Sequence, residues 1–285
     1  MTTYPDQPDA PGEHLRPPGG LDSQRPGPFE VTGPTRTEHQ PAVAPLHVAA
    51  RTGRWPAVAK RVALGLAMAA ALVLLVWLAL IVVYRFVDPP ASTLMLAERL
   101  QGGRVVQDWQ PLARISPNLM RAVVMSEDAR FCSHHGVDWD EIGNVIEQAG
   151  DGPLRGGSTI SMQVAKNLFL WSSKSYVRKA IEIPLTLVME VAWPKARILE
   201  IYLNVAEWGP GTFGAEAAAR RYFRKPASRL TEYEAALLAV VLPNPIARNA
   251  GAPGPGTRRL AQRLLLRMRG SGPYVGCLPL RRSLY

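Results

Sequence analysis

Few side chains in this 285-residue sequence could carry out chemistry, and Glu127 is the first of them. It ends a helical pattern in which Leu119 and Val123, eight and four residues earlier, share its face. A carboxyl group at the edge of an apolar face loses hydration, which raises its pKa toward the value that a general base needs near neutrality. Glu127 is therefore a candidate base, with a helix-end ion pair to Arg121 or Arg130 as the plainer alternative.

A second glutamate, Glu182, lies close to a concentration of positive charge. Four cations fall within fourteen residues: Lys166, Lys174, Arg178 and Lys179. Together they could bind an anion such as a diphosphate, although such runs are usually solvated faces. Glu182 follows Arg178 by four residues, which also suits a helix-surface ion pair worth roughly 0.2–0.5 kcal/mol.

Other familiar catalytic arrangements are disfavoured. Two histidines outside the N-terminal region, His134 and His135, are adjacent, so they do not share a helical face. The sequence has no HExxH, GxSxG or CxxC pattern, and so gives no sign of a His-ligated metal, a serine-hydrolase elbow or a zinc ribbon. Cys132 and Cys277 could form a disulfide in an oxidising compartment or remain free thiols.

An uncharged run from Val62 to Val83 predicts a membrane anchor. Its 22 residues would form a helix of about 33 Å, enough to cross a hydrocarbon core of about 30 Å. A buried core helix or a cleaved signal peptide is the alternative, but the run is long for either. Basic residues crowd its N-terminal side, so the positive-inside tendency places the N-terminus in the cytoplasm. We expect residues 62–84 to span the membrane once, with the larger C-terminal part outside.

The regions on either side of the anchor differ in composition. Residues 1–61 are rich in Pro and Gly and their charges nearly cancel, so we expect a disordered cytoplasmic tail. Residues 86–285 hold most of the chain's net charge of +10. A basic domain outside the membrane favours an anionic lipid or lipid-linked substrate, and no nucleic-acid-binding motif is present.

The remaining pattern is almost wholly helical. Apolar periodicity and capping residues predict a short extended stretch at 104–106, followed by a series of helices in which Pro184 must kink or break one. The predicted helices cover residues 116–128, 138–148, 158–170, 176–193, 195–206, 214–223, 231–241 and 257–269. We expect a mainly α domain at 104–270, a connecting segment at 85–103 before it and a C-terminal tail at 271–285.

Five short motifs follow one another over this domain. Residues 127–136 read EDARFCSHHG, 156–167 read GGSTISMQVAKN, 178–182 read RKAIE, 195–204 read KARILEIYLN and 218–223 read AARRYF. In this order they resemble the five motifs of the peptidoglycan glycosyltransferases, the lysozyme-like glycosyltransferase family 51. The stretch 207–216, EWGPGTFGAE, is similar to their monofunctional biosynthetic branch in Gram-negative bacteria. Ser161 and Met162 depart from the usual Thr and Gln, and Met162 lacks an amide for any polar role.

The resemblance implies a lysozyme-like glycosyltransferase domain preceded by a single transmembrane helix. Such a domain polymerises lipid II, a lipid-linked disaccharide-pentapeptide, by inverting transfer with release of a polyprenyl diphosphate. Glu127 and Glu182 match the family's two functional carboxylates, Glu127 as the base. Glu182 would orient the cations or hold a divalent cation such as Mg²⁺, and no other cofactor is implied. The residues expected to bind substrate are Asp128, Phe131, His134, Ser158, Thr159, Gln163, Lys166, Asn167, Lys174, Arg178, Lys179, Tyr202 and Asn204.

The resemblance also implies a location and partners. The protein would lie in the inner membrane with a periplasmic catalytic domain, and would act in cell wall biogenesis and cell shape. Its partners would be lipid II, the growing glycan strand, membrane lipids and wall-synthesis proteins of division or elongation. A lysozyme-like lytic enzyme that acts on finished glycan and a catalytically silent scaffold are the alternatives. The cation cluster argues against the first, and the two intact glutamates argue against the second.

Overall fold

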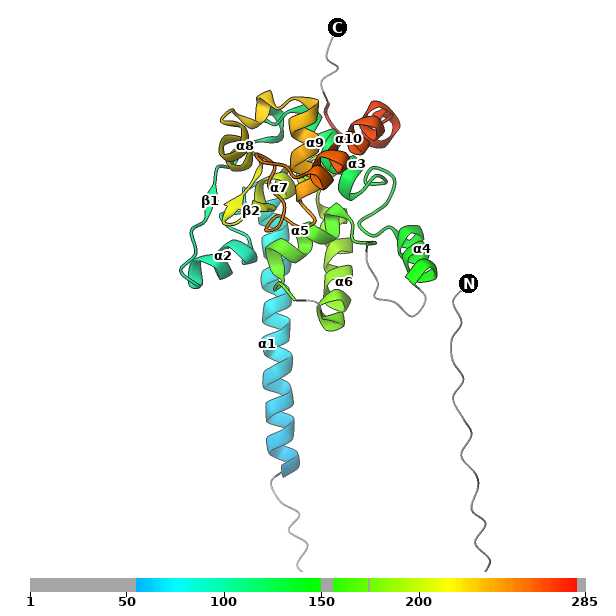
Figure 1. The fold of residues 1–285 in the computed structure, drawn as a ribbon. Helices are drawn as coiled ribbons and strands as arrows, with labels where there is room; N and C mark the ends of the chain where they lie inside the picture. Colours follow the sequence, from blue (N-terminus) through cyan, green and yellow to red (C-terminus); the bar gives the residue numbers. More distant parts are fainter. Residues whose placement is uncertain (1–54, 150–155, 174, 281–285) are drawn as a thin grey trace, which may run out of the picture. The chain divides into compact units, whose positions relative to one another are not determined.

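The computed structural model describes residues 55–149, 156–173 and 175–280 (Figure 1). It begins with α1 (Trp55–Tyr84), whose apolar part, Val58–Tyr84, has a mean hydropathy of 3.0 and is almost entirely exposed. Because water disfavours so much exposed apolar surface, α1 is a candidate membrane anchor. The helix also includes residues 55–61 before the uncharged run, among them Lys60 and Arg61, whose long side chains can reach a head-group layer. Residues 1–54 of the expected tail lie outside the described residues.

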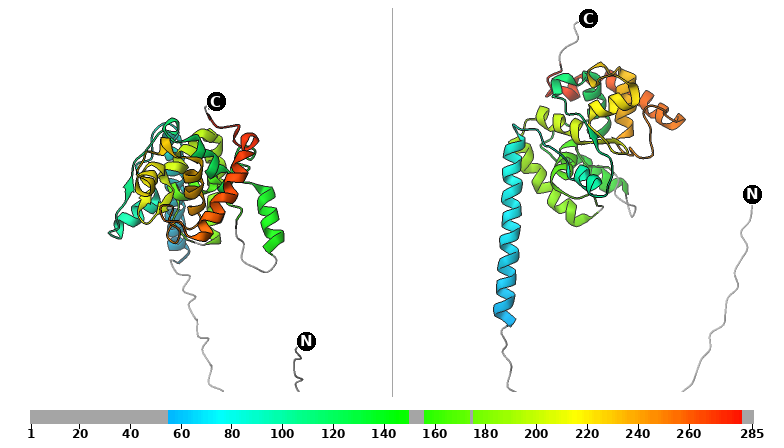
Figure 2. Two further views of the ribbon diagram at one scale, coloured as in Figure 1. Left: turned by 45° about the horizontal axis from the view of Figure 1, so that its top comes forward. Right: turned by 90° about the vertical axis from the view of Figure 1, so that its left-hand side faces the viewer.

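The end of α1 is fixed to the domain beside α6 (Tyr176–Ala192) and α7 (Lys195–Val205), as Figure 2 shows. Trp193, between these two helices, donates from Nε1 to the carbonyl of Ile81 (2.7 Å). Arg197 donates to the carbonyls of Tyr84 (3.0 Å) and Val87 (2.8 Å). Carbonyls in the last turn of a helix lack partners within it, so these side chains supply the missing donors.

Two groups of helices build the core of the domain (Figure 1). In one, α9 (Glu232–Val241) packs against both α3 (Pro117–Glu127) and α10 (Pro255–Arg269). In the other, α5 (Ile160–Phe169) packs against α6 and α7. Residues 235–241 of α9 are all buried, as expected for a helix that is apolar on every side.

Smaller elements complete the domain. The short helix α2 (Thr93–Leu100) precedes the core, α4 (Trp139–Ala149) follows the first motif, and α8 (Ala215–Phe223) follows the sheet. Single 3₁₀ turns lie at η1 (Leu112–Arg114), η2 (Ala227–Arg229) and η3 (Gly272–Val275). The sequence did not predict α2, because its eight residues carry only a short apolar pattern. Ser92 caps the helix.

Most of the predicted helices are confirmed to within a few residues, and local signals explain why. Ser116 caps α3 by accepting from the N–H of Asn118 (3.3 Å), and a proline occupies the first helical position. Thr159 caps α5 by accepting from the N–H of Met162 (3.1 Å). The helix α6 continues through Pro184, so this proline does not end it.

A small three-stranded sheet was only partly predicted. β1 (Val106–Gln107) pairs in parallel with β3 (Thr212–Phe213), which pairs antiparallel with β2 (Glu207–Gly209). The turn between β2 and β3 needs Gly211, which has φ +64°, and a Cβ there would lie 2.1 Å from the carbonyl oxygen of Arg104. The sheet thus depends on a close approach of segments a hundred residues apart.

Cys132 and Cys277 form a disulfide, with their Cα atoms 5.5 Å apart. The bond links the loop after α3 to the segment after η3. Val275 at the end of η3 and Leu278 on that segment are buried against the domain. The described part of the C-terminal region, residues 271–280, is therefore packed rather than loose.

Candidate active site

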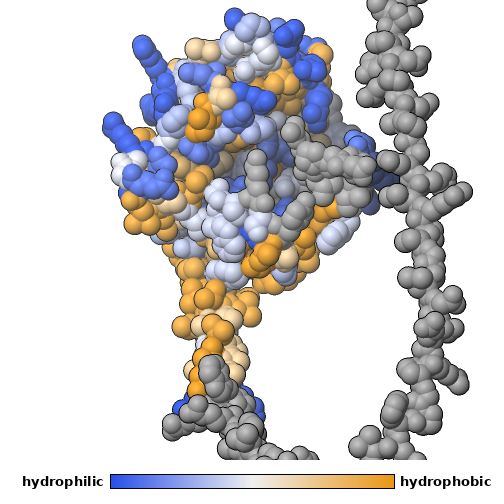
Figure 3. Space-filling model, turned by 60° about the horizontal axis from the view of Figure 1, so that its bottom comes forward, coloured by the Kyte–Doolittle hydropathy of each residue, from blue (hydrophilic) through white to orange (hydrophobic). Residues whose placement is uncertain are grey.

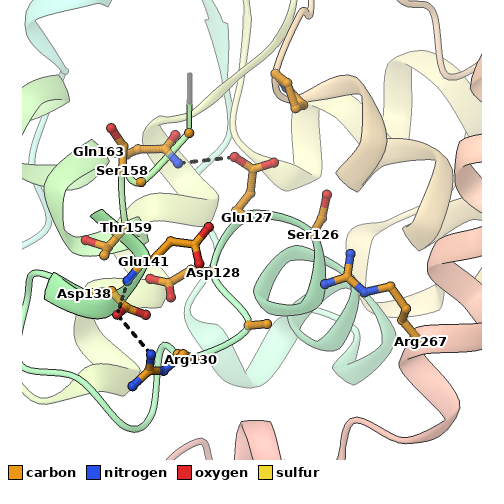
Figure 4. A pocket seen from close by; sticks show the side chains of 14 residues that line it. Ser126, Glu127, Asp128, Arg130, Asp138, Glu141, Ser158, Thr159, Gln163 and Arg267 are labelled. Carbon is orange, nitrogen blue, oxygen red and sulfur yellow. Dashed lines mark hydrogen bonds and ion pairs between the residues drawn. The ribbon is translucent and has the colours of Figure 1, made fainter. Parts of the chain in front are cut away.

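A cleft of about 620 Å³ opens beside the C-terminal end of α3 (Figure 4). Its walls come from residues 126–130, from residues 156–159 that lead into α5, and from Asp138, Glu141 and Gln163. Pro243 and Arg267 close it from the later part of the chain. Figure 4 shows Glu127 and Gln163 facing each other across the cleft from α3 and α5.

Glu127 is half-buried at the edge of this cleft. Gln163 donates from Nε2 to its Oε2 (3.2 Å). Burial raises the pKa of Glu127, and the hydrogen bond from Gln163 opposes part of that rise. Within the described residues Arg130 pairs instead with Asp138 (3.3 Å) and Asp140 (2.7 Å). Arg130 therefore does not form the helix-end ion pair with Glu127 that the sequence also allowed.

Asp128 is buried directly behind Glu127 and joins three segments. Its Oδ2 accepts from the N–H of Ile160 (2.9 Å), the first residue of α5. His134 Nε2 lies 3.0 Å from both of its carboxylate oxygens. A carboxylate at a helix N-terminus is favoured by the helix dipole. Asp128 thus holds the end of α3 against the start of α5.

Glu182, only 2% exposed, is held by two cations of α6. Arg178 Nη1 contacts its Oε2, and Lys179 Nζ lies 2.8 Å from its Oε1. A buried carboxylate needs such partners, because an uncompensated buried charge is costly. The pair is therefore not the exposed surface interaction that the spacing also allowed. Lys179 Nζ also donates to Oγ of Ser158 (3.0 Å), a residue of the cleft wall.

Lys166, on α5, is close enough to both Glu127 and Glu182 for each carboxylate to affect its pKa. Burial lowers its pKa, and the neighbouring cations Arg178 and Lys179 lower it further. Glu182, and more weakly Glu127, act in the opposite direction by favouring the charged ammonium. The cation cluster lies outside the lining of the cleft, but Lys179 reaches Ser158 on the cleft wall, and Lys166 is close enough to Glu127 to favour its charged form.

Four residues expected to bind substrate lie beneath the site, outside the cleft lining: Phe131, His134, Tyr202 and Asn204. Phe131 and Asn204 are 0% exposed. The amide of Asn204 donates to the carbonyls of Gln110 (2.9 Å) and Glu200 (2.8 Å) and accepts from the N–H of Gln110 (2.8 Å). All four side chains are buried in this structure, and their expected contact with substrate stays a prediction.

The remaining expected residues fall in different places. Ser158 and Thr159 line the cleft, and Thr159 is buried as the cap of α5. The backbone carbonyl of Asn167 accepts from the hydroxyl of Thr93 (3.0 Å). Lys174 lies outside the described residues.

Several residues of the cleft were not singled out from the sequence as site residues. They are Ser126, Ala129, Arg130, Asp138, Glu141, Gly156, Gly157, Pro243 and Arg267. Most adjoin the first two motifs, so proximity in the chain was a usable signal. Arg267 lies far from Glu127 in sequence, and only the packing of α10 against α3 brings it there.

A divalent cation at Glu182 does not fit this arrangement. Both carboxylate oxygens of Glu182 already contact Arg178 and Lys179, and an added cation would meet their positive charges. Within the described residues no group of three or more His, Cys, Asp or Glu side chains gathers around one point. The positive charge beside Glu182 is therefore supplied by Arg178 and Lys179.

Comparison with known proteins places this geometry in a family. Residues 95–269 match the family model described as Transglycosylase. A biosynthetic peptidoglycan transglycosylase of Brucella suis biovar 1 is 50% identical over 222 residues, which cover 76% of this chain and 98% of the relative. Its counterpart in Rhizobium johnstonii is 50% identical over 222 residues, covering 77% of this chain and 90% of the relative. One in Agrobacterium fabrum is 53% identical over 190 residues, covering 66% and 84%. The chain belongs to the transglycosylase family.

Proposed function

We propose that this protein is a peptidoglycan glycosyltransferase that polymerises lipid II into glycan strands and releases a polyprenyl diphosphate. The observation that carries the proposal is the half-buried Glu127 in a cleft, next to a cluster of cations formed by Lys166, Arg178 and Lys179. Transfer of a sugar from a diphosphate needs a base for the incoming hydroxyl and positive charge for the departing group. The site supplies both.

Glu127 acts as the base in this proposal. The 4-hydroxyl of the acceptor sugar attacks the anomeric carbon of the donor, and its proton passes to the Glu127 carboxylate. As the new carbon–oxygen bond forms, the bond from the anomeric carbon to the diphosphate oxygen breaks and the electron pair leaves with the diphosphate. Attack from the opposite face converts an α-linked donor into a β-linked product. Burial assists the step, because a raised pKa makes Glu127 a better proton acceptor.

The cation cluster stabilises the departing diphosphate. Lys166 and Lys179 are ammonium groups partly removed from water, where a charge interacts more strongly than in bulk solvent. Glu182 fixes the side chains of Arg178 and Lys179, so these donors need little reorganisation during the reaction. Asp128, already held by Ile160 and His134, positions the site rather than taking the proton.

The surface near α1 supports a position at a membrane interface. Exposed apolar side chains form a stripe along α6: Val177, Leu187, Val188 and Val191. Figure 3 shows hydrophobic surface gathered where α1 meets the domain. We infer that this side faces lipid head groups, the level at which the phosphates of lipid II lie.

Two further features support a periplasmic domain on the inner membrane. Basic residues precede α1 in the sequence, which favours a cytoplasmic N-terminus. The disulfide between Cys132 and Cys277 suits an oxidising compartment. Both agree with a single-pass protein whose cleft faces outward.

Incubation of the full-length protein in detergent with labelled lipid II tests the proposal. A glycan polymer is the expected product. Soluble fragments released from isolated cell wall, without lipid II consumption, would instead indicate a lytic enzyme. Binding of lipid II without turnover would indicate a silent scaffold, and either of these results rejects the proposed function.

A further inference from the structure

A series of arginines runs along α10 from the cleft. Arg259, Arg263 and Arg267 are four residues apart, so they lie along one side of the helix at intervals of about 6 Å. All three are exposed. Arg267 lines the cleft that holds Glu127, and Figure 4 shows its guanidinium on the side of Ser126. The series therefore begins at the candidate active site and leads away from it.

The fold explains this series only in part, since the helix dipole favours Arg267 in the last turn of α10 but does not account for Arg259 and Arg263. The helix α10 contains five arginines and no acidic residue. In the part of the chain that the structure describes, none of the five forms an ion pair. Like charges four residues apart disfavour a helix. Arg259 and Arg263 also line a separate surface hollow with Leu260 and Leu266. A ligand in this hollow would meet both positive charge and apolar surface.

We propose that Arg259, Arg263 and Arg267 form a docking track for the stem peptides of the growing glycan strand. The inference rests on the proposed function, because a polymer of disaccharide-pentapeptide units carries a free peptide carboxylate at every repeat. Such a strand is a regular polyanion as it leaves the cleft. A guanidinium matches a carboxylate through two parallel hydrogen bonds.

The track would act through repeated weak contacts rather than through one strong one. An exposed ion pair contributes little alone, but each contact after the first forms at a high effective concentration. A strand held in this way stays near Glu127 between additions. The track therefore favours further elongation over release of the product.

The same helix supplies a matched control. Arg258 and Arg269 are also exposed, but at about 100° per residue they lie on the opposite side of α10 from Arg267. Arg258→Gln with Arg269→Gln removes the same charge as Arg259→Gln with Arg263→Gln. Arg267 stays in place in both double variants, so the lining of the cleft is unchanged.

The first test measures binding without catalysis. Full-length protein in detergent is titrated with preformed soluble glycan strands that either carry pentapeptide stems or have been stripped of them. The wild type and the Arg258/Arg269 control should bind stem-bearing strands about tenfold more tightly than stripped strands at low salt, and the Arg259/Arg263 variant should lose this difference. Added salt should weaken the preference. Equal binding of stem-bearing strands by the wild type and the Arg259/Arg263 variant overturns the track.

The second test measures the length of the polymer made from lipid II. The Arg259/Arg263 variant should consume lipid II in the first turnover as the wild type does but make strands several-fold shorter. Unchanged strand length rejects the track while leaving the proposed function intact. A wild type that makes no polymer rejects the proposed function, and the binding test still decides whether the arginines recognise stem peptides.

Discussion

Gln163 donates from Nε2 to Oε2 of Glu127 (3.2 Å), and Tyr202, buried beneath the cleft, determines which end of the Gln163 amide faces Glu127. Tyr202 donates its hydroxyl to Oε1 of Gln163 (3.2 Å). Burial raises the pKa of Tyr202 well above its usual value, so the hydroxyl keeps its proton and remains a donor. With its oxygen engaged by Tyr202, the amide presents its NH₂ group to Glu127. A residue buried under the cleft thus controls the contact made to the candidate base.

Glu127→Gln should abolish most activity without loss of stability. Removing the base should lower lipid II polymerisation at least about 100-fold, the lower end of what general base catalysis supplies. Because burial raises the pKa of Glu127, its charged form destabilises the fold above that pKa, so a neutral amide should leave Tm unchanged or higher at pH 7. Turnover of labelled lipid II and thermal unfolding check both parts. Near wild-type turnover would end the assignment of Glu127 as base.

Gln163→Met should shift the pH dependence of the reaction. The base must be deprotonated, so the rate falls as pH drops through the pKa of Glu127, which burial places above its ordinary value of 4.5. The donor on Gln163 favours the carboxylate, so its removal raises that pKa and moves the acid limb to higher pH.

Tyr202→Phe is the matched variant for this experiment. It removes the hydroxyl that orients Gln163 but leaves the amide, so it should produce a smaller shift in the same direction. Profiles of kcat/KM against pH decide the matter. An acid limb that stays in place in Gln163→Met, or moves to lower pH, contradicts the role given to this hydrogen bond.

Lys166→Met should weaken binding of the diphosphate more than Glu127→Gln does. The ammonium group is partly buried beside Arg178 and Lys179, and a hydrogen bond to a charged group is worth about 1.5–3 kcal/mol, or roughly tenfold or more in affinity. Titration with a diphospholipid analogue measures the difference. Equal affinities of the two variants would remove Lys166 from the anion site.

Cys277→Ser should destabilise the domain. The disulfide to Cys132 closes a loop with a sequence separation of 145 residues, and loss of a native disulfide typically costs about 2–5 kcal/mol. Chemical denaturation with and without reductant provides the measurement. Reductant should lower the stability of the wild type toward that of Cys277→Ser and have little effect on the variant itself. Equal stability of both proteins in oxidising buffer would show that the bond contributes nothing to the fold.

The sequence predicted the features that short-range signals determine. The cap at Ser116 fixed the start of α3, and apolar spacing placed Glu127 at its end. The pairing of β1 with β3 was not predicted, because strands of two residues have no pattern of their own and their partners lie a hundred residues apart. Arg267 was not predicted as a site residue for the same reason, since only tertiary packing brings it to the cleft.

The sequence also did not show which of the motif residues would be buried. Asn204 has the chemistry of a substrate ligand, yet every polar atom of its amide is used by the chain itself. Glu182 follows Arg178 at a spacing common on helix surfaces, and only the packing of α6 against α5 removes it from solvent. The family resemblance identified these positions, but the fold determines whether they touch a ligand.

Trp193 and Arg197 donate hydrogen bonds to carbonyls near the end of α1, so contacts beyond the chain connection join this helix to the domain. In a membrane, a domain joined in this way would turn with a change in the tilt of α1, and the cleft would move relative to the lipid head groups. The thickness of the bilayer, which affects the tilt of a spanning helix, would then affect the distance between Glu127 and the lipid phosphates.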